Sequence, residues 1–254
     1  MTLDSTPLLV VQNLTKRFGG LTAVDKVSLS FYPGGVQSII GPNGAGKTTF
    51  FNLLSGLFPP TAGRVFFKGE EITRLTPYEI FRRRIVRTFQ ISSIFPDLSV
   101  LKNVQIAAQG RFRTSPGPWG RLNRRRQEIT GWCLEYMARL NLLDKKDQKA
   151  GLLAYGDKRR LEIAMGLVCE PEMLLLDEPT AGMSPAETRE TAQLLKSLAA
   201  GLTIILVEHD MRVVMGISDR VIVLHQGAVL CDGGPREVQE NQEVQSVYLS
   251  GRKK

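Results

Sequence analysis

A glycine-rich stretch of nine residues constrains the fold of this chain more than any other segment. It follows the apolar segment VQSII, residues 36–40, which reads as a buried β-strand, and it runs into a predicted helix from Lys47 to about Leu57. The stretch matches the spacing G-x-x-x-x-G-K-[ST], in which glycines let backbone N–H groups turn toward phosphate oxygens without a Cβ clash. The predicted phosphate loop consists of Gly41, Pro42, Asn43, Gly44, Ala45, Gly46, Lys47, Thr48 and Thr49.

Two side chains of this loop indicate a nucleoside triphosphate as the ligand. A lysine at position 47 would reach the β- and γ-phosphates, and the hydroxyl of Thr48 would bind Mg²⁺. The alternative is a glycine turn without a ligand, but the strand before the loop and the helix after it favour phosphate binding. The sequence therefore predicts a nucleoside triphosphate and Mg²⁺ as ligands.

A pair of carboxylates, Asp177 and Glu178, ends the apolar segment MLLLDE, residues 173–178. Ligands of open α/β sheets bind at the carboxyl ends of the strands, which is where this pair is expected. Asp177 is predicted to join the Mg²⁺ shell through water, and Glu178 to polarise the attacking water. The alternative is a strand that ends in a solvated acidic turn.

The distribution of apolar segments predicts an α/β fold with a helical insertion. Apolar strands alternate with helices after residue 170, which indicates a mostly parallel sheet covered on both faces. Between Thr76, a predicted helix N-cap, and about Gly151 the pattern is mainly helical, with a Pro/Gly-rich break at 114–120.

We therefore expect a core formed by residues 1–90 and 169–254, with strands at 8–12 and 27–31 near its start. A helical lobe, residues 91–168, is expected to be inserted into this core, and the last helix is expected from Pro235 to Leu249.

Composition narrows the classes of protein that fit. The 254 residues include no apolar run near the roughly 20 residues of a membrane span, and the N-terminus lacks a secretory signal pattern. Three scattered cysteines and two histidines predict reduced thiols and no disulfide or histidine-based metal site. The net charge of +8 comes from short basic clusters, which fit solvated helix faces first, a membrane surface second and nucleic acid last.

The order of five motifs resembles that of ATP-binding cassette (ABC) ATPases, from about Leu8 to the C-terminus. The motifs are the phosphate loop, Gln90, the turn LAYGD at 153–157, the acidic pair and His209. The glycine turn before a basic helix, about twenty residues ahead of the acidic pair, is the most specific of them. The resemblance implies a RecA-like P-loop core with an N-terminal antiparallel β part.

The resemblance also implies roles for residues outside the loop. Phe18 would stack on adenine, Gln90 would sense Mg²⁺ and the attacking water, and His209 would contact the γ-phosphate. Phe18 could instead be a core residue, and Gln90 a polar residue at a strand end. His225 is read as a surface residue.

The turn at 153–157 is a second candidate anion-binding site. The resemblance implies that it binds the ATP held by the opposite subunit of a dimer. Ala154 replaces the usual serine, so backbone N–H groups would make the contact with the γ-phosphate that the serine hydroxyl makes. Elsewhere, Ser184 replaces an aspartate but can still cap the next helix. The turn consists of Leu153, Ala154, Tyr155, Gly156 and Asp157.

Further stretches, such as GLTAVDKVSL and EHDMRVVMGISDRVIVL, resemble ATPase subunits of branched-chain amino-acid-type importers, and VLHQGAVL those of urea and amide importers. The implied partners are a second ATPase subunit (a paralogue or a second copy), two membrane permease subunits and, indirectly, a solute-binding protein, at the cytoplasmic face of the membrane. A groove near residues 91–104 would receive a permease helix, with Ile94, Phe95, Leu98 and Leu101 as apolar candidates or as lobe core. The rivals are a non-transport ABC ATPase and a module with an inactive site.

Overall fold

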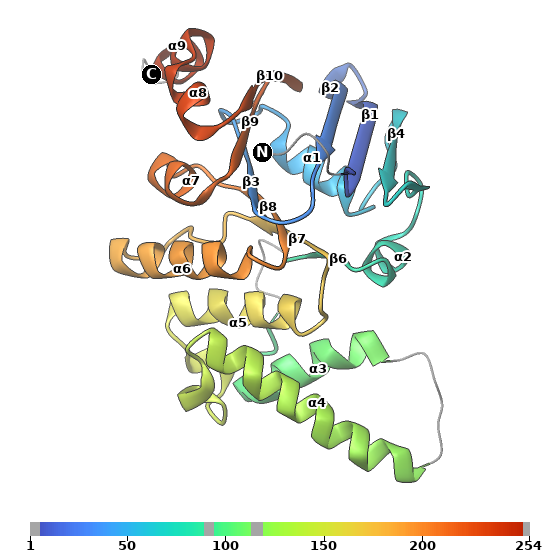
Figure 1. Cartoon of the computed structure of the whole chain (residues 1–254), viewed down its shortest axis with the longest axis vertical. Coiled ribbons are helices and arrows are strands. Elements are labelled where there is room, and N and C mark those ends of the chain that lie inside the picture. The colour runs from blue at the N-terminus through green and yellow to red at the C-terminus, as the bar shows by residue number, and fades with distance from the viewer. Residues whose placement is uncertain (1–5, 89–93, 113–118, 251–254) are drawn as a thin grey trace.

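The computed structural model describes the backbone of residues 6–88, 94–112 and 119–250. Two sheets organise this part of the chain (Figure 1). The first is antiparallel, with strand order β2-β1-β4-β5, and the second has the order β10-β9-β3-β8-β7-β6, in which only the β10–β9 pair is antiparallel. The strands are β1 (Leu9–Phe18), β2 (Leu21–Phe31), β3 (Val36–Ile40), β4 (Ala62–Phe67), β5 (Glu70–Glu71), β6 (Ile85–Arg87), β7 (Met173–Asp177), β8 (Thr203–Val207), β9 (Arg220–His225) and β10 (Ala228–Gly233).

The expected mostly parallel sheet with helices on both faces is confirmed. Every residue of β3, β7 and β8 is buried, as strands covered on both faces require. On one face Ile39 and Ile205 pack with Phe50 of α1 and with the antiparallel sheet, and on the other Leu206 packs with Leu195 of α6. The helices are α1 (Lys47–Leu54), α2 (Pro77–Arg82), α3 (Val100–Phe112), α4 (Trp119–Arg139), α5 (Tyr155–Leu167), α6 (Pro185–Leu198), α7 (Met211–Ile217), α8 (Pro235–Glu240) and α9 (Gln242–Ser250).

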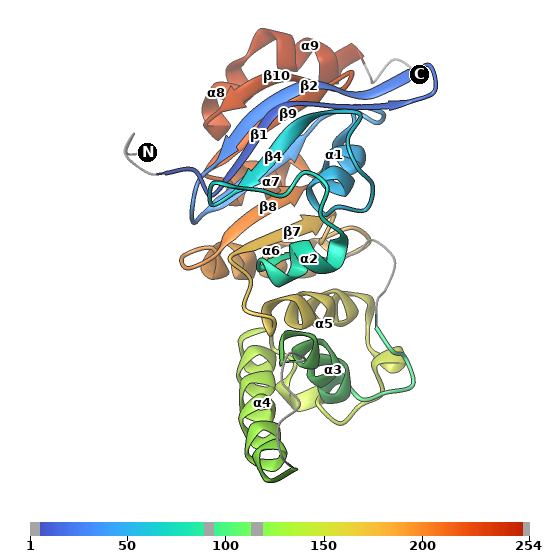
Figure 2. The same ribbon diagram turned by 90° about the vertical axis from the view of Figure 1, so that its right-hand side faces the viewer.

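Helices α3, α4 and α5 form a group at one end of the molecule, on the far side of α6 from α7, α8 and α9 (Figures 1 and 2). Met137, Leu140 and Leu161 are fully buried within this group. The same apolar cluster continues into the sheet face that α6 covers. The division at residues 90/91 and 168/169 into a core and an inserted lobe remains our proposal.

Both predicted helix caps are present, and each forms a capping box. The hydroxyl of Thr76 accepts from the N–H of Glu79 at the start of α2, and that of Ser184 accepts from the N–H of Glu187 at the start of α6. In each case the glutamate carboxylate accepts from the N–H of the cap residue. These caps fix where the helices begin.

The mainly helical segment expected from Thr76 to Gly151 is wrong at its start. Helix α2 ends at Arg82, and β6 follows it. The strand is only three residues long and is defined by its parallel pairing with β7, where Ile85 lies opposite Met173. The predicted break at 114–120 falls mostly on residues 114–118, which lie outside the described residues.

Near the C-terminus the single helix expected from Pro235 to Leu249 is two helices, α8 and α9. Asn241, between them, has an extended backbone, and its side-chain oxygen accepts from the N–H of Val244, which starts a new helix. Strand β10, which was not expected, pairs with β9 after a turn at 226–227. In the described part of the chain, no helix combines the length and apolarity needed to cross a membrane.

Candidate functional site

The loop at residues 41–49 lies between β3 and α1 at the carboxyl edge of the parallel sheet (Figure 1). Its backbone requires glycine where it approaches neighbouring chain segments. Gly46 has φ +97°, and a Cβ atom there would overlap the carbonyl oxygen of Ala23. The same is true of Gly41, where a Cβ atom would overlap the carbonyl oxygen of Leu224. The tight course of the loop therefore depends on its glycines.

Positive charge and free N–H groups meet at this loop. Gly46 caps α1 without a side-chain hydrogen bond, so the first-turn N–H groups of the helix are available to an anion. The Lys47 ammonium donates to the carbonyl oxygens of Gly41 at 2.7 Å and Pro42 at 3.0 Å. Burial lowers the pKa of Lys47, and the nearby Glu178 and Asp177 oppose that shift. The arrangement forms an electropositive binding site for phosphate.

Asp177 is the last residue of β7 and is 3% exposed. Its Oδ2 lies 3.1 Å from Nη2 of Arg87, while its Oδ1 is buried and has no hydrogen-bond partner among the described residues. Burial raises the pKa of Asp177, and Arg87 counteracts this. A buried carboxylate oxygen left unpaired beside a phosphate loop suits a hard divalent cation such as Mg²⁺.

Glu178 follows Asp177 in a left-handed backbone conformation, with φ +50°. This conformation is uncommon for a residue with a Cβ atom and is concentrated at functional sites. The N–H of Glu178 donates to the carbonyl oxygen of Val207 at 2.8 Å, which anchors the turn to β8. The side chain is 33% exposed and reaches the pocket beside the phosphate loop.

This pocket has a volume of about 470 Å³. Its walls are the phosphate loop from Asn43 to Thr49, Glu178, Gln226 and residues 21–23 at the start of β2. Phe18 ends β1 on the same hairpin and is 46% exposed, so the alternative that it is a core residue is wrong. Its ring meets Phe58 edge to face at 5.5 Å, and stacking on adenine remains a prediction.

His209 follows β8 and faces Glu178. Its Nδ1 lies 3.7 Å from Oε1 of Glu178, and its side chain is 63% exposed. The structure thus brings Lys47, Asp177, Glu178 and His209 to one edge of the sheet. Gln90 lies outside the described residues.

The turn at 153–157 starts α5 as expected, with Tyr155 as the first helical residue. Ala154 is the N-cap and provides no side-chain hydrogen bond, so the N–H groups of the first turn depend on other acceptors. Asp157 pairs with Lys145 at 2.6 Å. Both views place α5 with α3 and α4 and apart from α1, so the turn and the phosphate loop are separate within one chain (Figures 1 and 2).

Two charged residues at the site were missed by sequence reasoning, Arg87 and Glu208. Arg87 ends β6 and bridges Asp177 to Asn52 and Ser55 at the end of α1. Glu208 ends the apolar run of β8 and is buried beside His209. For Glu208 a signal existed, because an acidic residue after a buried strand is the feature that identified Asp177; Arg87 had none.

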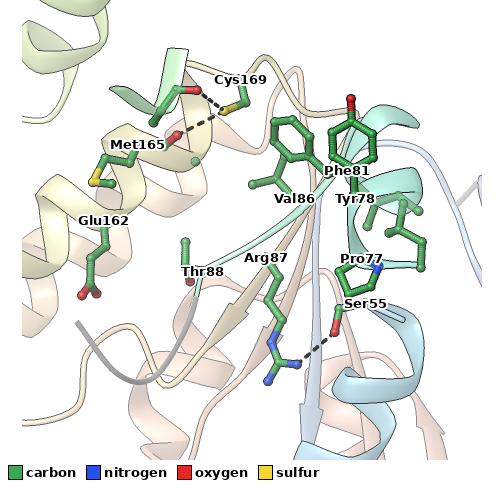
Figure 3. A pocket seen from close by; sticks show the side chains of 14 residues that line it. Ser55, Pro77, Tyr78, Phe81, Val86, Arg87, Thr88, Glu162, Met165 and Cys169 are labelled. Carbon is green, nitrogen blue, oxygen red and sulfur yellow. Dashed lines mark hydrogen bonds between the residues drawn. The ribbon is translucent and has the colours of Figure 1, made fainter. Parts of the chain in front are cut away.

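A second, apolar pocket of about 410 Å³ lies between α2, β6, α3 and α5 (Figure 3). Tyr78 and Phe81 of α2 stand on one side of it, and Met165 and Cys169 on the other. None of the four apolar residues expected to line a groove near residues 91–104 lines this pocket. Ile94 and Leu101 pack against the core, whereas Phe95 and Leu98 are 47% and 37% exposed. The lobe-core alternative is therefore confirmed for Ile94 and Leu101, and contact of Phe95 and Leu98 with a permease helix stays a prediction.

Known proteins share both the sequence and the fold. The family model described as "ABC transporter" matches residues 24–181. The chain is 42% identical to the high-affinity branched-chain amino acid transport ATP-binding protein LivG of Escherichia coli K12, covering 96% of this chain and 98% of that protein. It is 41% identical to BraF of Pseudomonas aeruginosa, which carries the same description, with the same coverage.

Solved structures agree with this similarity. An ATP-binding cassette of an ABC transporter in its ADP conformation superposes with a TM-score of 0.85 at 30% identity, over 96% of this chain and 99% of that one. A dimeric cassette in a post-hydrolysis state, bound to ADP and Pi, superposes with a TM-score of 0.74 at 28% identity, over 90% of this chain and 99% of that one.

Proposed function

This chain belongs to the ABC transporter family of ATP-hydrolysing cassettes, and we propose that it powers an importer of branched-chain or other hydrophobic amino acids. The observation that supports ATP hydrolysis is the meeting of Lys47, Asp177 and Glu178 at the carboxyl edge of the sheet. The proposed solute rests on the names of LivG and BraF, which resemble this chain over nearly its whole length.

Binding of ATP is assigned to the phosphate loop and the pocket beside it. Lys47 would exchange its bonds to the carbonyl oxygens of Gly41 and Pro42 for bonds to the β- and γ-phosphates. The first-turn N–H groups of α1 would donate to phosphate oxygens. Phe18, at the end of β1, would stack on the adenine ring.

Mg²⁺ would be held by Thr48, Gln90 and Asp177, the last through its unpaired Oδ1. When bound, the ion would neutralise part of the negative charge on the β- and γ-phosphates. Arg87 donates a hydrogen bond to Oδ2 of Asp177, so Oδ1 stays available for the ion.

Hydrolysis is assigned to Glu178 and His209. The Glu178 carboxylate would accept a proton from the attacking water or orient it, because its side chain is partly exposed to the pocket. His209, 3.7 Å from that carboxylate, would donate to a γ-phosphate oxygen. Both side chains follow neighbouring strands, so the β7–β8 pairing brings their two loops to the same edge of the sheet.

The turn at 153–157 would complete the site of an opposite cassette. It lies in the α3–α5 group, apart from the phosphate loop of its own chain, yet it presents free N–H groups at the start of α5. ATP would then be enclosed between two chains, either a paralogue pair or two copies. This is the basis for proposing a dimer.

The apolar pocket between α2 and α5 is the proposed contact with a membrane permease. Tyr78 is 63% exposed and Phe81 is partly buried at the pocket, so a partner helix could cover both. The cassettes would bind two permease subunits, which would place this chain at the cytoplasmic face of the membrane. A solute-binding protein would act through the permease subunits. Nucleic acid is not proposed as a partner.

The test is reconstitution. The chain is produced with candidate permease subunits and a second ATPase, and uptake of leucine, urea and a short amide is compared in ATP-loaded vesicles. ATP-dependent uptake of leucine supports the proposal. Uptake of urea or the amide alone would favour the alternative importer class, and reproducible recovery with ribosomes or nucleic acid instead would favour a non-transport ATPase.

A further inference from the structure

Glu208 is a buried carboxylate to which the mechanism above assigns no role. It directly follows β8, and its side chain has no exposed surface. A buried charge is costly unless hydrogen bonds compensate for the lost water. In the described part of the chain, the only basic side chain within 4.0 Å of it is His209, so its stabilisation comes from hydrogen bonds.

Each oxygen of this carboxylate accepts hydrogen bonds from a different loop. Oε1 accepts from the backbone N–H of Thr180 at 3.1 Å and from the Thr180 hydroxyl. Oε2 accepts from the backbone N–H of His209 at 2.9 Å and from that of Asp210 at 3.4 Å. The first loop also carries Glu178, and the second carries His209.

These contacts continue the linkage between β7 and β8 beyond the point where the strands end. Asp177 lies opposite Val207 in the sheet, and the N–H of Glu178 donates to Val207. After these residues the two segments leave the sheet, and no strand pairing among the described residues holds them together. Glu208 takes over that task, because charge-assisted bonds to N–H groups are stronger than neutral ones.

We propose that Glu208 is a positioning residue that fixes the loop of Glu178 and the loop of His209 relative to each other. It does not touch ATP in this scheme. It sets the distance between the group that handles water and the group that contacts the γ-phosphate. The proposal rests on the roles assigned to Glu178 and His209 under the proposed function.

A solely structural role would have a different signature. Loss of general stability lowers the amount of folded protein without changing the kinetics of the folded fraction. Loss of positioning lowers kcat and leaves nucleotide affinity unchanged, because the described contacts of Glu208 involve neither the phosphate loop nor the adenine side of the pocket.

The central variant is Glu208→Gln, measured in whichever assembly hydrolyses ATP. The amide keeps the shape of the side chain, but its NH₂ group faces two donors, so one loop loses its acceptor. We expect kcat to fall about 10- to 100-fold, the size of effect that a misplacement of about 1 Å produces. Binding of a fluorescent ADP analogue should be unchanged.

Glu237→Gln is the matched control. Its carboxylate also accepts from a backbone N–H, that of Gly234 at 2.7 Å, but at the start of α8. It should hydrolyse ATP at close to the wild-type rate. Thr180→Val should act like Glu208→Gln, because it removes a hydroxyl donor to Oε1, and Thr180→Ser should retain more turnover than Thr180→Val.

A double-mutant cycle with His209→Ala decides the proposal. If Glu208 acts through His209, adding Glu208→Gln to His209→Ala should lower kcat by less than about threefold further. Fully additive losses in kcat would overturn the positioning role but not the proposed function. The same holds if Glu208→Gln keeps wild-type kcat while Glu178→Gln is inactive. Wild-type turnover in Glu178→Gln would instead overturn the proposed function.

Discussion

At the scale of single residues, the candidate site depends on charges that are held out of water by named partners. Arg87 and Asp177 form such a pair at 3.1 Å, with side chains 8% and 1% exposed. Arg87 also donates to Asn52 and Ser55, so one guanidinium connects α1, β6 and β7. The Asp177 carboxylate, which faces the phosphate loop, is therefore held by an arginine whose own side chain is almost entirely out of water.

Replacing Arg87 by methionine should leave the Asp177 carboxylate buried without its cation. Breaking one side of a buried pair costs about 3–5 kcal/mol of unfolding free energy. Urea unfolding of Arg87→Met and of the double variant Arg87→Met/Asp177→Asn tests this, and the double variant should recover much of the loss. A loss below about 1 kcal/mol in Arg87→Met would contradict a buried-pair role.

The cysteines give a pH-dependent prediction. Burial raises the pKa of Cys133 and of Cys169 to about 11, from an ordinary value of 9.0, so their thiolate fraction near pH 8 should be about 100-fold lower than that of an ordinary thiol. Cys231 is only half-buried.

Alkylation with iodoacetamide, followed by mass spectrometry of tryptic peptides, should therefore modify Cys231 first. Because the pKa values are raised, labelling of Cys133 and Cys169 should accelerate only as the pH rises toward 11. Equal labelling rates for all three cysteines at pH 8 in the folded protein would contradict this account of their burial.

At the scale of elements, helix starts place functional segments. Ser184 begins α6 six residues after Glu178, with both hydrogen bonds of a capping box. Ser184→Ala should lower the unfolding free energy by about 1 kcal/mol, while Ser184→Asp should keep most of it. Thermal unfolding of both variants checks the prediction, and equal stability of Ser184→Ala and wild type would show that the cap contributes little.

How far the sequence predicts an element depends on whether the signal is local. The loop at 41–49, the buried strands β3, β7 and β8, and the caps at Thr76 and Ser184 were all predictable, because a few adjacent residues carry each signal. Strand β6 was not, since it is three residues long and exists through its pairing with β7. Asn241 likewise divides the last helix by a single side-chain bond.

The same distinction applies to the site. Lys47 and the acidic pair are identified by their place in a local pattern. Arg87 is identified only by partners that lie far away in the chain, such as Asp177, which is 90 residues away. Glu208 carries a local signal, but its bonds to Thr180, 28 residues away, are visible only in the structure. Contacts of this kind depend on which strands become neighbours, which a single sequence does not specify.

At the scale of the whole molecule, two surfaces are proposed to face other chains. One is the site edge with the turn at 153–157, and the other is the apolar pocket between α2 and α5 (Figure 3). Phe81→Glu places a charge in that pocket without altering the phosphate loop. It should abolish co-purification with permease subunits and leave binding of a fluorescent ATP analogue intact.

A control for this variant is Tyr32→Glu. Tyr32 is a partly exposed aromatic residue that does not line the pocket. It should retain the permease subunits. Permease binding that survives Phe81→Glu would place the membrane contact elsewhere on the molecule. Loss of permease binding with both variants would indicate a general effect on folding.

The most direct test of ATP hydrolysis at this site is phosphate release by Glu178→Gln beside wild type. Glu178 is the carboxylate that reaches the pocket, so its amide should lower turnover at least about 100-fold, as loss of general base or water orientation does. Binding of fluorescent ATP should persist, and the variant should dimerise more readily with ATP. Turnover near the wild-type rate would contradict the account.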